Sequence, residues 1–337
     1  MADNLQQIQI SIIVPIYNVE KYLEECLDSI AGKHEEVVEI LLIDDGSTDN
    51  SGVIAENYAN LYKNIFLYHK VNGGLSDARN YGIWRARGKY VLFLDSDDFI
   101  SDDALDIILF ECINNQLDII LWDANVVDDN RNKITENNFY CHNGLNNNCI
   151  SSGKEILKRQ ILARNDYPAT VWLGLYNREY LISNNFWFEN GLLHEDEFWT
   201  PKVLIEAEAV KYLKESIYYY RLSQNSIMRR HDHDYSRNIE CIIYIYSSML
   251  VYYDWKLKDS ELCKLLKGNI VKKYLNVIGK YNIYKYPFLK KKINRLELLL
   301  NATTINDKLK ALILLINTRI YCLIMNVSHK NINYNED

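Results

Sequence analysis

Carboxylates follow a short apolar run in the N-terminal half of the chain. Residues 91–94 are all apolar, and Asp95, Asp97 and Asp98 come directly after them. Carboxylates two residues apart in extended backbone can place oxygen ligands around one hard divalent cation, which would offset the charge of a diphosphate. In the alternative, Asp97 and Asp98 begin a turn and cap the helix expected to start near Ser101. Because an apolar run leads straight into the acids, we favour a metal site.

Two more loops carry residue types that suit a nucleotide. Residues 44–47 read Asp-Asp-Gly-Ser, in which Asp45 could accept a hydrogen bond from a base N–H, although the same residues are common in turns. Residues 72–75, Asn-Gly-Gly-Leu, open a helix whose exposed amides suit phosphate, with Arg79 about one turn inside. An ordinary left-handed turn beside a solvated arginine would give the same pattern. Neither motif decides between its two interpretations by itself.

A second acidic segment lies much further along the chain. Residues 194–197, His-Glu-Asp-Glu, stand immediately before Phe198 and Trp199. One carboxylate beside an aromatic wall could act as a base toward a sugar hydroxyl. By spacing alone, helix capping by Glu195 and Asp196 with the two aromatic side chains in the core explains the segment better.

Apolar periodicity predicts the elements that would position these groups. Short β-branched runs alternate with helical stretches from residue 8 to about 127, as in a parallel sheet with crossover helices, where ligands bind at the carboxyl ends of the strands. We expect strands at 10–17, 37–44, 65–70, 90–95 and 117–126. We expect helices at 19–31, 50–61, 75–87 and 101–114, with Asp49 and Ser101 as N-caps.

The rest of the chain is less regular at first and then helical. Residues 128–149 are rich in Asn and Asp, which predicts a loop, hairpin or insertion. Residues 234–327 carry Tyr, Ile and Leu at helical spacing, so we expect an all-α tail, which could also supply the interface of a homo-oligomer. The apolar stretch 309–327 is too polar for a transmembrane span. It either packs on the helical tail or makes peripheral contact with a membrane.

Composition narrows the class of protein. The chain has 337 residues, 48% of them apolar and 25% charged, which is enough for one large core or two smaller ones. A net charge of -7 gives no general attraction to nucleic acid. Seven cysteines, an odd number without close pairs, favour a reducing cytoplasm over a disulfide framework or a zinc site. The first residues show no secretory signal, so we expect a cytoplasmic protein.

Four motifs in register resemble the family 2 inverting glycosyltransferases of the GT-A fold. They are SIIVPIYN at 11–18, LLIDDGSTDN at 41–50, NGGLSDARN at 72–80 and YVLFLDSDD at 90–98. The resemblance implies an α/β fold with a Rossmann-like, mostly parallel sheet, and the helical spacing beyond it adds an α-helical C-terminal region. Together they divide the chain into a donor-binding half at 1–127, an acceptor-side half with the catalytic base at 128–230, and a helical region at 231–337.

The resemblance also assigns roles to single residues. The donor-binding residues that it implies are Pro15, Tyr17, Asn18, Asp44, Asp45, Asn72, Arg79, Asp95 and Ser96. Asp45 would bind the base, and Arg79 would face the diphosphate. Asp95 and Asp97 look like the DxD motif that binds Mn²⁺ or Mg²⁺, with Asp97 as the direct ligand. Asp196 resembles the general base of the family, with Glu195 as the fallback.

A basic cluster follows the aromatic run at 218–220. It could close on phosphates or form a solvated loop. Together with the residues before it, the cluster loosely resembles the flexible segment that covers the diphosphate in the family. These residues are Tyr220, Arg221, Ser226, Arg229, Arg230, His231 and His233.

The reaction implied by the resemblance is inverting transfer of a sugar from a nucleotide-diphosphate sugar, a UDP-sugar by family habit, to a glycan acceptor. The likeness is to bacterial enzymes that extend capsule, exopolysaccharide or O-antigen repeats, often on lipid-linked acceptors at the inner face of the cell membrane. Two alternatives stay open. A sugar nucleotidyltransferase should show a Gly-rich basic loop after the first strand, where this chain has VPIYNVEKY. A non-catalytic sugar-nucleotide or glycan-binding module would keep the fold with an idle base.

Overall fold

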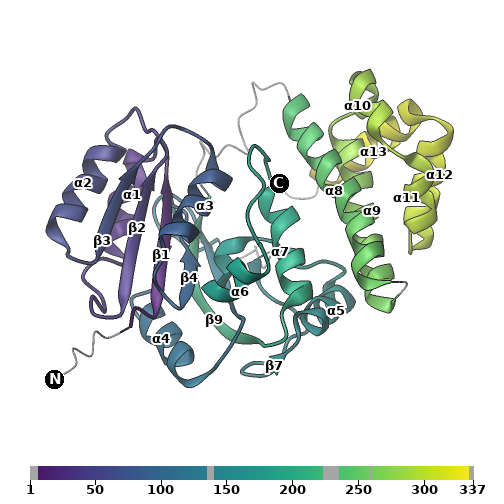
Figure 1. Cartoon of the computed structure of the whole chain (residues 1–337). Helices are drawn as coiled ribbons and strands as arrows, with labels where there is room; N and C mark the ends of the chain where they lie inside the picture. Colours follow the sequence, from purple (N-terminus) through teal and green to yellow (C-terminus); the bar gives the residue numbers. More distant parts are fainter. Residues whose placement is uncertain (1–6, 135–139, 223–234, 259, 334–337) are drawn as a thin grey trace. The chain divides into compact units, whose positions relative to one another are not determined.

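The chain folds as two compact units (Figure 1). The computed structural model describes residues 7–134, 140–222, 235–258 and 260–333, with side chains described up to Met325. The N-terminal unit comprises residues 1–160 and 167–229, and the C-terminal unit comprises residues 161–166 and 230–337. The functional roles that the sequence suggests for 1–127, 128–230 and 231–337 stay predictions.

Four parallel strands form one part of the sheet in the N-terminal unit. In spatial order they are β3 (Ile65–His69), β2 (Val38–Asp44), β1 (Ile10–Ile16) and β4 (Tyr90–Phe93). Every residue of β1, β2 and β4 is buried, as expected for strands that are covered on both faces. Ile16 pairs with Asp44, and Ile13 pairs with Phe93, so the carboxyl ends of these strands share one edge. These four predicted strands are confirmed to within two residues at each end.

The other part of the sheet is mixed. β8 (Gly174–Asn177) lies between β4 and β6 (Ile119–Val127) and is antiparallel to both. β9 (Val210–Arg221) runs parallel to β6, and the short β5 (Phe99–Ile100) and β7 (Ile150–Ser151) pair with β9 in the antiparallel sense. Periodicity predicts β6 but misses β8, because four residues are too few to show an alternation. The sheet is therefore mixed and mostly parallel, in an α/β fold.

Helices cover the sheet and connect its strands. They are α1 (Glu20–Asp28), α2 (Ser51–Leu61), α3 (Leu75–Arg85), α4 (Ala104–Asn114), α5 (Gly153–Arg164), α6 (Arg178–Ser183) and α7 (Glu195–Glu206), with a 3₁₀ helix at Val171–Leu173. The four helices predicted from the sequence are confirmed, but their predicted N-caps are wrong. Asn50 and Asp103 hold the cap positions. Asp49 belongs to the preceding loop, where its carboxylate accepts the amide of Ser51 at 3.0 Å.

The C-terminal unit is helical, as the sequence predicts. Its elements are α8 (Ser236–Leu257), α9 (Glu261–Lys280), a 3₁₀ helix at Ile283–Lys285, α10 (Pro287–Lys292), α11 (Arg295–Asn301), α12 (Ile305–Ile316) and α13 (Thr318–Asn333). Tyr253, Tyr274 and Tyr321 are fully buried here, so these tyrosines are core residues. The stretch 309–327 is divided between α12 and α13, and none of the helices in the described ranges is long and apolar enough to cross a membrane.

Candidate functional site

Hydrogen bonds join the loops that follow β1 and β2. Asn18 has a left-handed backbone with φ 51°, and its side-chain oxygen accepts the amide of Thr48 at 2.8 Å. The amide of Asn18 in turn donates to the hydroxyl of Ser47 at 3.2 Å. Pro15 is buried within β1, whereas Tyr17 is 53% exposed at the edge of the sheet. The structure therefore brings the first two predicted motifs into direct contact.

Asp44 ends β2 and Asp45 follows it, and the two carboxylates have different partners. Asp44 accepts the amide of Ser47 at 3.0 Å and contacts Nδ1 of His69 at 2.7 Å. Burial alone would raise the pKa of the Asp44 carboxyl, but these hydrogen bonds from Ser47 and His69 together lower it. Asp44 is therefore a fixed anion that shapes the loop after β2.

Asp45 organises the glycine-rich loop before α3. Its carboxylate accepts the amides of Gly73 at 2.9 Å and Gly74 at 2.7 Å, and it forms an ion pair with Lys70. The amides that the sequence suggests for a phosphate thus donate to Asp45 in this structure. Asn72, the first residue of the motif, is exposed beside them. The role of Asp45 in binding a base stays a prediction.

The acids after β4 differ in their partners. The Asp98 carboxylate is buried and accepts the Tyr218 hydroxyl and the Arg221 amide, each at 2.7 Å. Asp95 accepts a hydrogen bond from Arg79 at 2.8 Å. Within the described ranges, no other residue donates a hydrogen bond to the Asp97 carboxylate. Burial, and then the charge of Asp95, raise the pKa of Asp97 to about 6.

The same turn does not cap α4. Asp103 holds the N-cap position of that helix, and Asp98 is committed to Tyr218 and Arg221 instead. Burial, followed by the charges of Asp97 and Asp95, holds the pKa of Asp98 well above its ordinary value. The turn therefore gathers acids that repel one another, with one carboxylate left open, and this is the environment that a cation would relieve.

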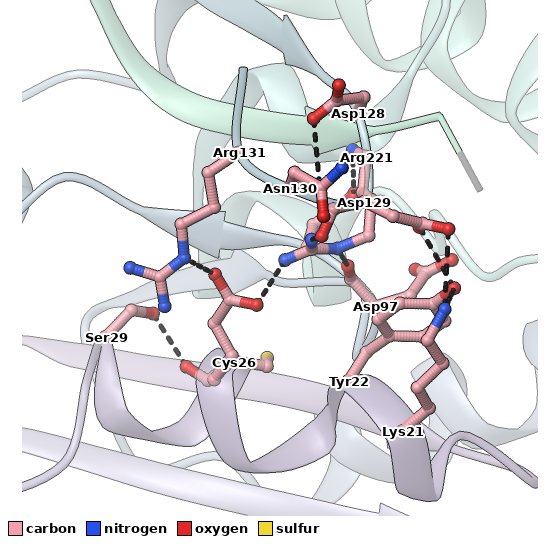
Figure 2. A network of polar contacts seen from close by, with 12 residues as sticks. Lys21, Tyr22, Cys26, Ser29, Asp97, Asp128, Asp129, Asn130, Arg131 and Arg221 are labelled. Carbon is pink, nitrogen blue, oxygen red and sulfur yellow. Dashed lines mark hydrogen bonds and ion pairs between the residues drawn. The ribbon is translucent and has the colours of Figure 1, made fainter. Parts of the chain in front are cut away.

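Arg221, at the end of β9, fixes the backbone of this turn. Its Nε donates to the carbonyl oxygen of Asp97 at 2.9 Å, and its Nη2 donates to Glu25 at 2.6 Å. Figure 2 shows the Arg221 side chain beside Asp97 and Asp129, and its Nη1 donates to the carbonyl oxygen of Asp129 at 3.5 Å. Arg131 forms a second ion pair with Glu25. The sequence suggests that Arg221 belongs to a flexible segment over the diphosphate. That suggestion is wrong for this residue, because its charge is buried and paired with Glu25.

Arg79 links the β4 turn to α7. Its guanidinium donates to Asp95 at 2.8 Å and to Glu195 at 2.5 Å, and it lies over the ring of Phe188 at 5.4 Å from the ring centroid. Only 2% of the residue is exposed, so the solvated arginine considered from the sequence is wrong. Two carboxylates from segments 100 residues apart in the chain neutralise its charge. How Arg79 contacts a donor stays a prediction.

The first turn of α7 holds the predicted base. Asp196 is half-buried and accepts the amide of Glu197 at 2.9 Å, while Glu195 is buried against Arg79. Burial, followed by the charges of Glu195 and Glu197, raises the pKa of Asp196. Phe198 and Trp199 are buried, so the interpretation of these two as core residues is confirmed. His194, rather than either predicted acid, holds the N-cap position.

An aromatic cluster that the sequence does not reveal lies near both acidic groups. Trp172 stacks on Tyr218, with ring centroids 4.4 Å apart, and on Tyr220 at 5.4 Å. Tyr140 contacts Trp172 at 5.0 Å and Tyr220 at 4.8 Å. Burial raises the pKa of Tyr140, and the charges of Asp196 and Asp98 add to the rise, which places this ring within electrostatic reach of both acids. The run of tyrosines at 218–220 is the one signal of this cluster in the sequence.

Some of the remaining predicted residues lie in the described part of the chain, and the others lie outside it. Ser96 is buried in the β4 turn, and Tyr220 belongs to the aromatic cluster. Ser226, Arg229, Arg230, His231 and His233 lie outside the described residues. Among the residues that are described, no three His, Cys, Asp or Glu side chains form a group that could hold a metal by itself.

Comparison with known proteins identifies the family of this chain. Residues 11–183, just over half of the chain, match the sequence profile of glycosyl transferase family 2. The chain belongs to this family. The uncharacterized glycosyltransferase EpsJ of Bacillus subtilis is 37% identical over 220 residues, which cover 65% of this chain and 62% of EpsJ. The minor teichoic acid biosynthesis protein GgaA of the same species is 32% identical over 232 residues, 65% of this chain and 49% of GgaA. The chain thus spans less than two thirds of either relative.

Solved structures share the fold of this family 2 member. Residues 1–349 of Staphylococcus aureus TarS, in complex with UDP-GlcNAc, match with a TM-score of 0.71 at 20% identity over 96% of this chain and 92% of that one. The mannosyltransferase PcManGT of Pyrobaculum calidifontis, in complex with GDP-Man and Mn²⁺, matches with a TM-score of 0.52 at 15% identity, over 95% of this chain and 84% of that one. At these identities the likeness establishes the GT-A-like α/β fold with C-terminal helices.

Proposed function

We propose that this family 2 protein is an inverting glycosyltransferase that moves a sugar from a UDP-sugar to a glycan acceptor in the assembly of a surface polysaccharide. The β4 turn carries the proposal, because Asp97 keeps an open carboxylate while its neighbours are fixed by Arg79, Tyr218 and Arg221. The complex of TarS with UDP-GlcNAc supports a UDP-sugar donor. The name of GgaA supports a polymer of the cell surface as the product. Such an acceptor could be lipid-linked.

Asp97 would be the direct ligand of Mn²⁺ or Mg²⁺, with Asp95 beside it. Asp97 shares a turn with two other acids, so a divalent cation held there would offset their repulsion. When bound, the cation would supply stabilisation of the negative charge that develops on the leaving diphosphate. The Mn²⁺ complex of PcManGT supports a metal in this fold. The open carboxylate of Asp97 beside Asp95 therefore fits a divalent cation.

Asp196 would act as the general base. Its raised pKa makes the carboxylate a better proton acceptor than an exposed one. Tyr140 and Tyr220, the partly exposed rings of the aromatic cluster, offer apolar surface on which a sugar could lie. In the step that we propose, the acceptor hydroxyl gives its proton to Asp196 as its oxygen bonds to the anomeric carbon. The bond from that carbon to the diphosphate breaks on the opposite side, so the anomeric configuration inverts. Residues 1–127 would hold the donor, and residues 128–230 would hold the acceptor.

Release of UDP from a panel of UDP-sugars, with Mn²⁺ and with EDTA, tests this function. We expect release to require the metal and to fall about a thousandfold in Asp97→Ala, since a catalytic metal contributes several kcal/mol to the transition state. Asp102→Ala removes an exposed acid close by and should leave the rate unchanged. Asp196→Asn should bind UDP and Mn²⁺ with nearly unchanged affinity and lose about 10²–10⁴-fold in turnover.

Three outcomes would overturn parts of the proposal. Full activity in Asp97→Ala, or UDP binding that ignores Mn²⁺, would remove the metal role. Unchanged turnover in Asp196→Asn would move the base elsewhere, to Glu195 first. Metal-dependent binding of UDP-sugars with neither hydrolysis nor transfer would indicate the non-catalytic binding module instead.

A further inference from the structure

The helix α12 carries apolar residues on two opposite faces. Ala311 and Leu314 are buried, whereas Leu309, Leu312 and Ile316 are 55%, 43% and 75% exposed. With Ile305, which is 81% exposed, the exposed residues recur at helical spacing and lie within about 60° of one another around the axis. The buried residues lie on the other side. Packing inside the C-terminal unit therefore explains one apolar face of α12 and leaves the other unexplained.

The next helix repeats this arrangement. On α13 the hydroxyl of Tyr321 donates to the carbonyl of Leu275 in α9 at 2.9 Å, which fixes the inner side of the helix. Ile320, Leu323 and Ile324 are each about half exposed and lie on the other side of α13. α12 and α13 pack on α9 and on each other (Figure 1). Their exposed stripes lie on the sides of the two helices opposite the residues buried by this packing. We name these seven residues, four on α12 and three on α13, the outer apolar face.

Positive charge lies beside the outer apolar face. Residues 281–325 contain eight Lys or Arg and two Asp or Glu residues, a net charge of +6 in a chain whose total is -7. Lys308 and Arg319 are exposed and flank the stripes on α12 and α13, and Lys291 is exposed on α10. A protein surface that joins exposed aliphatic side chains to a local excess of lysine suits the headgroup region of an anionic bilayer.

We infer that the outer apolar face docks on the surface of an anionic phospholipid membrane. The aliphatic side chains of α12 and α13 would enter the boundary between headgroups and acyl chains, and Lys308 and Arg319 would lie among lipid phosphates. The docking is peripheral, in keeping with the absence of a membrane-spanning helix in the described residues. Membrane docking needs neither sugar donor nor metal, so it can be tested independently of the proposed reaction.

Flotation of the full chain with vesicles tests the inference. We expect binding to vesicles of phosphatidylglycerol and phosphatidylcholine, little binding to phosphatidylcholine alone, and a decline as salt is raised from 0.05 to 0.5 M. The triple variant Leu309→Ser/Leu312→Ser/Ile316→Ser should lose binding about tenfold or more. Lys308→Gln/Arg319→Gln should lose about 25-fold, since each positive charge near an anionic surface contributes about fivefold.

A matched control comes from α4 in the N-terminal unit. Phe110 and Ile113 are 65% and 69% exposed, but their helix and the turn before it carry Asp102, Asp103 and Asp106. Phe110→Ser/Ile113→Ser should therefore bind vesicles like the wild type. All the substituted side chains are exposed, so the midpoint of thermal unfolding should not change. If the triple variant fails to fold, the dependence of wild-type binding on lipid charge and salt still decides the question.

The inference is overturned if the wild type ignores anionic vesicles at low salt, or if the α4 control weakens binding as much as the α12 variant does. It is also overturned if sedimentation velocity shows a dimer that the α12 variant dissociates. That result would assign the outer apolar face to a second copy of the chain.

Discussion

Two buried arginines fix the β4 turn by different means. Arg79 donates hydrogen bonds to the carboxylates of Asp95 and Glu195, which together neutralise its charge. Arg221 binds the main-chain oxygen of Asp97 and is neutralised by Glu25. A buried arginine can therefore fix an acidic turn without binding the carboxylate that the turn presents. The Asp97 carboxylate stays open because Arg221 donates to the backbone oxygen of Asp97 instead.

The largest effect on stability should come from Arg79. Arg79→Met leaves Glu195 buried without its partner, and breaking a buried ion pair on one side costs about 3 kcal/mol of unfolding free energy. Urea unfolding measures this cost. A loss below about 1 kcal/mol, the range of surface pairs, would contradict the account of Arg79 as a buried link between β4 and α7.

A second change sharpens the same point. Arg79→Met/Glu195→Leu also removes the buried carboxylate that Arg79 neutralises at α7, so most of the stability lost in Arg79→Met should return, because apolar replacement of both partners is often nearly neutral. The same urea titration decides it. Losses that simply add would mean that Arg79 and Glu195 act separately.

Arg221→Met should have a smaller effect on stability. Glu25 is 22% exposed, so water can solvate its carboxylate, and the loss should be about 1.5–2 kcal/mol, the lower part of the range for hydrogen bonds to a charged group. The turn would lose its backbone anchor. We therefore expect weaker Mn²⁺-dependent binding of UDP in calorimetric titration. If the variant is less stable but binds UDP normally, Arg221 contributes to folding stability alone.

The smallest effect is a shift in the pH dependence of activity. A base acts when deprotonated, so kcat/KM should be lost as pH falls through the pKa of Asp196, which burial raises. The positive charge of Arg79 opposes that rise. In Arg79→Met the acidic limb of the pH–rate profile should therefore move to higher pH, while in Arg221→Met it should stay in place. Equal movement in both variants would contradict the separation of the two arginines.

The sequence predicts the parts of this molecule that depend on neighbours along the chain. The alternation of apolar runs and helices places β1 to β4 and α1 to α4, and the acids after β4 stand where the pattern puts them. The helical tail follows from spacing in the same way. These predictions succeed because burial on both faces of a parallel strand leaves a continuous apolar run.

The partners of these acids depend on contacts that local patterns do not carry. Glu25 and Arg221 are 196 residues apart in the chain, and Tyr218 reaches Asp98 across 120. Trp172 lies in a 3₁₀ helix without periodicity, and the occupation of Asp45 by two glycine amides follows from the fold of the loop. For the same reason, the two faces of α12 read as a single apolar stretch in the sequence.

The single antiparallel strand between the two parallel parts of the sheet has a topological consequence. β8 reverses direction once on either side, so β4 and β6 point the same way, and β9 follows β6. The number of reversals between β4 and β9 is therefore even. An odd number would deliver the end of β9 to the opposite rim, a full strand length from the acids. The contact between Arg221 and Asp97 therefore depends on an even number of reversals in strand direction. If that number were odd, no side-chain substitution could bring the two residues together.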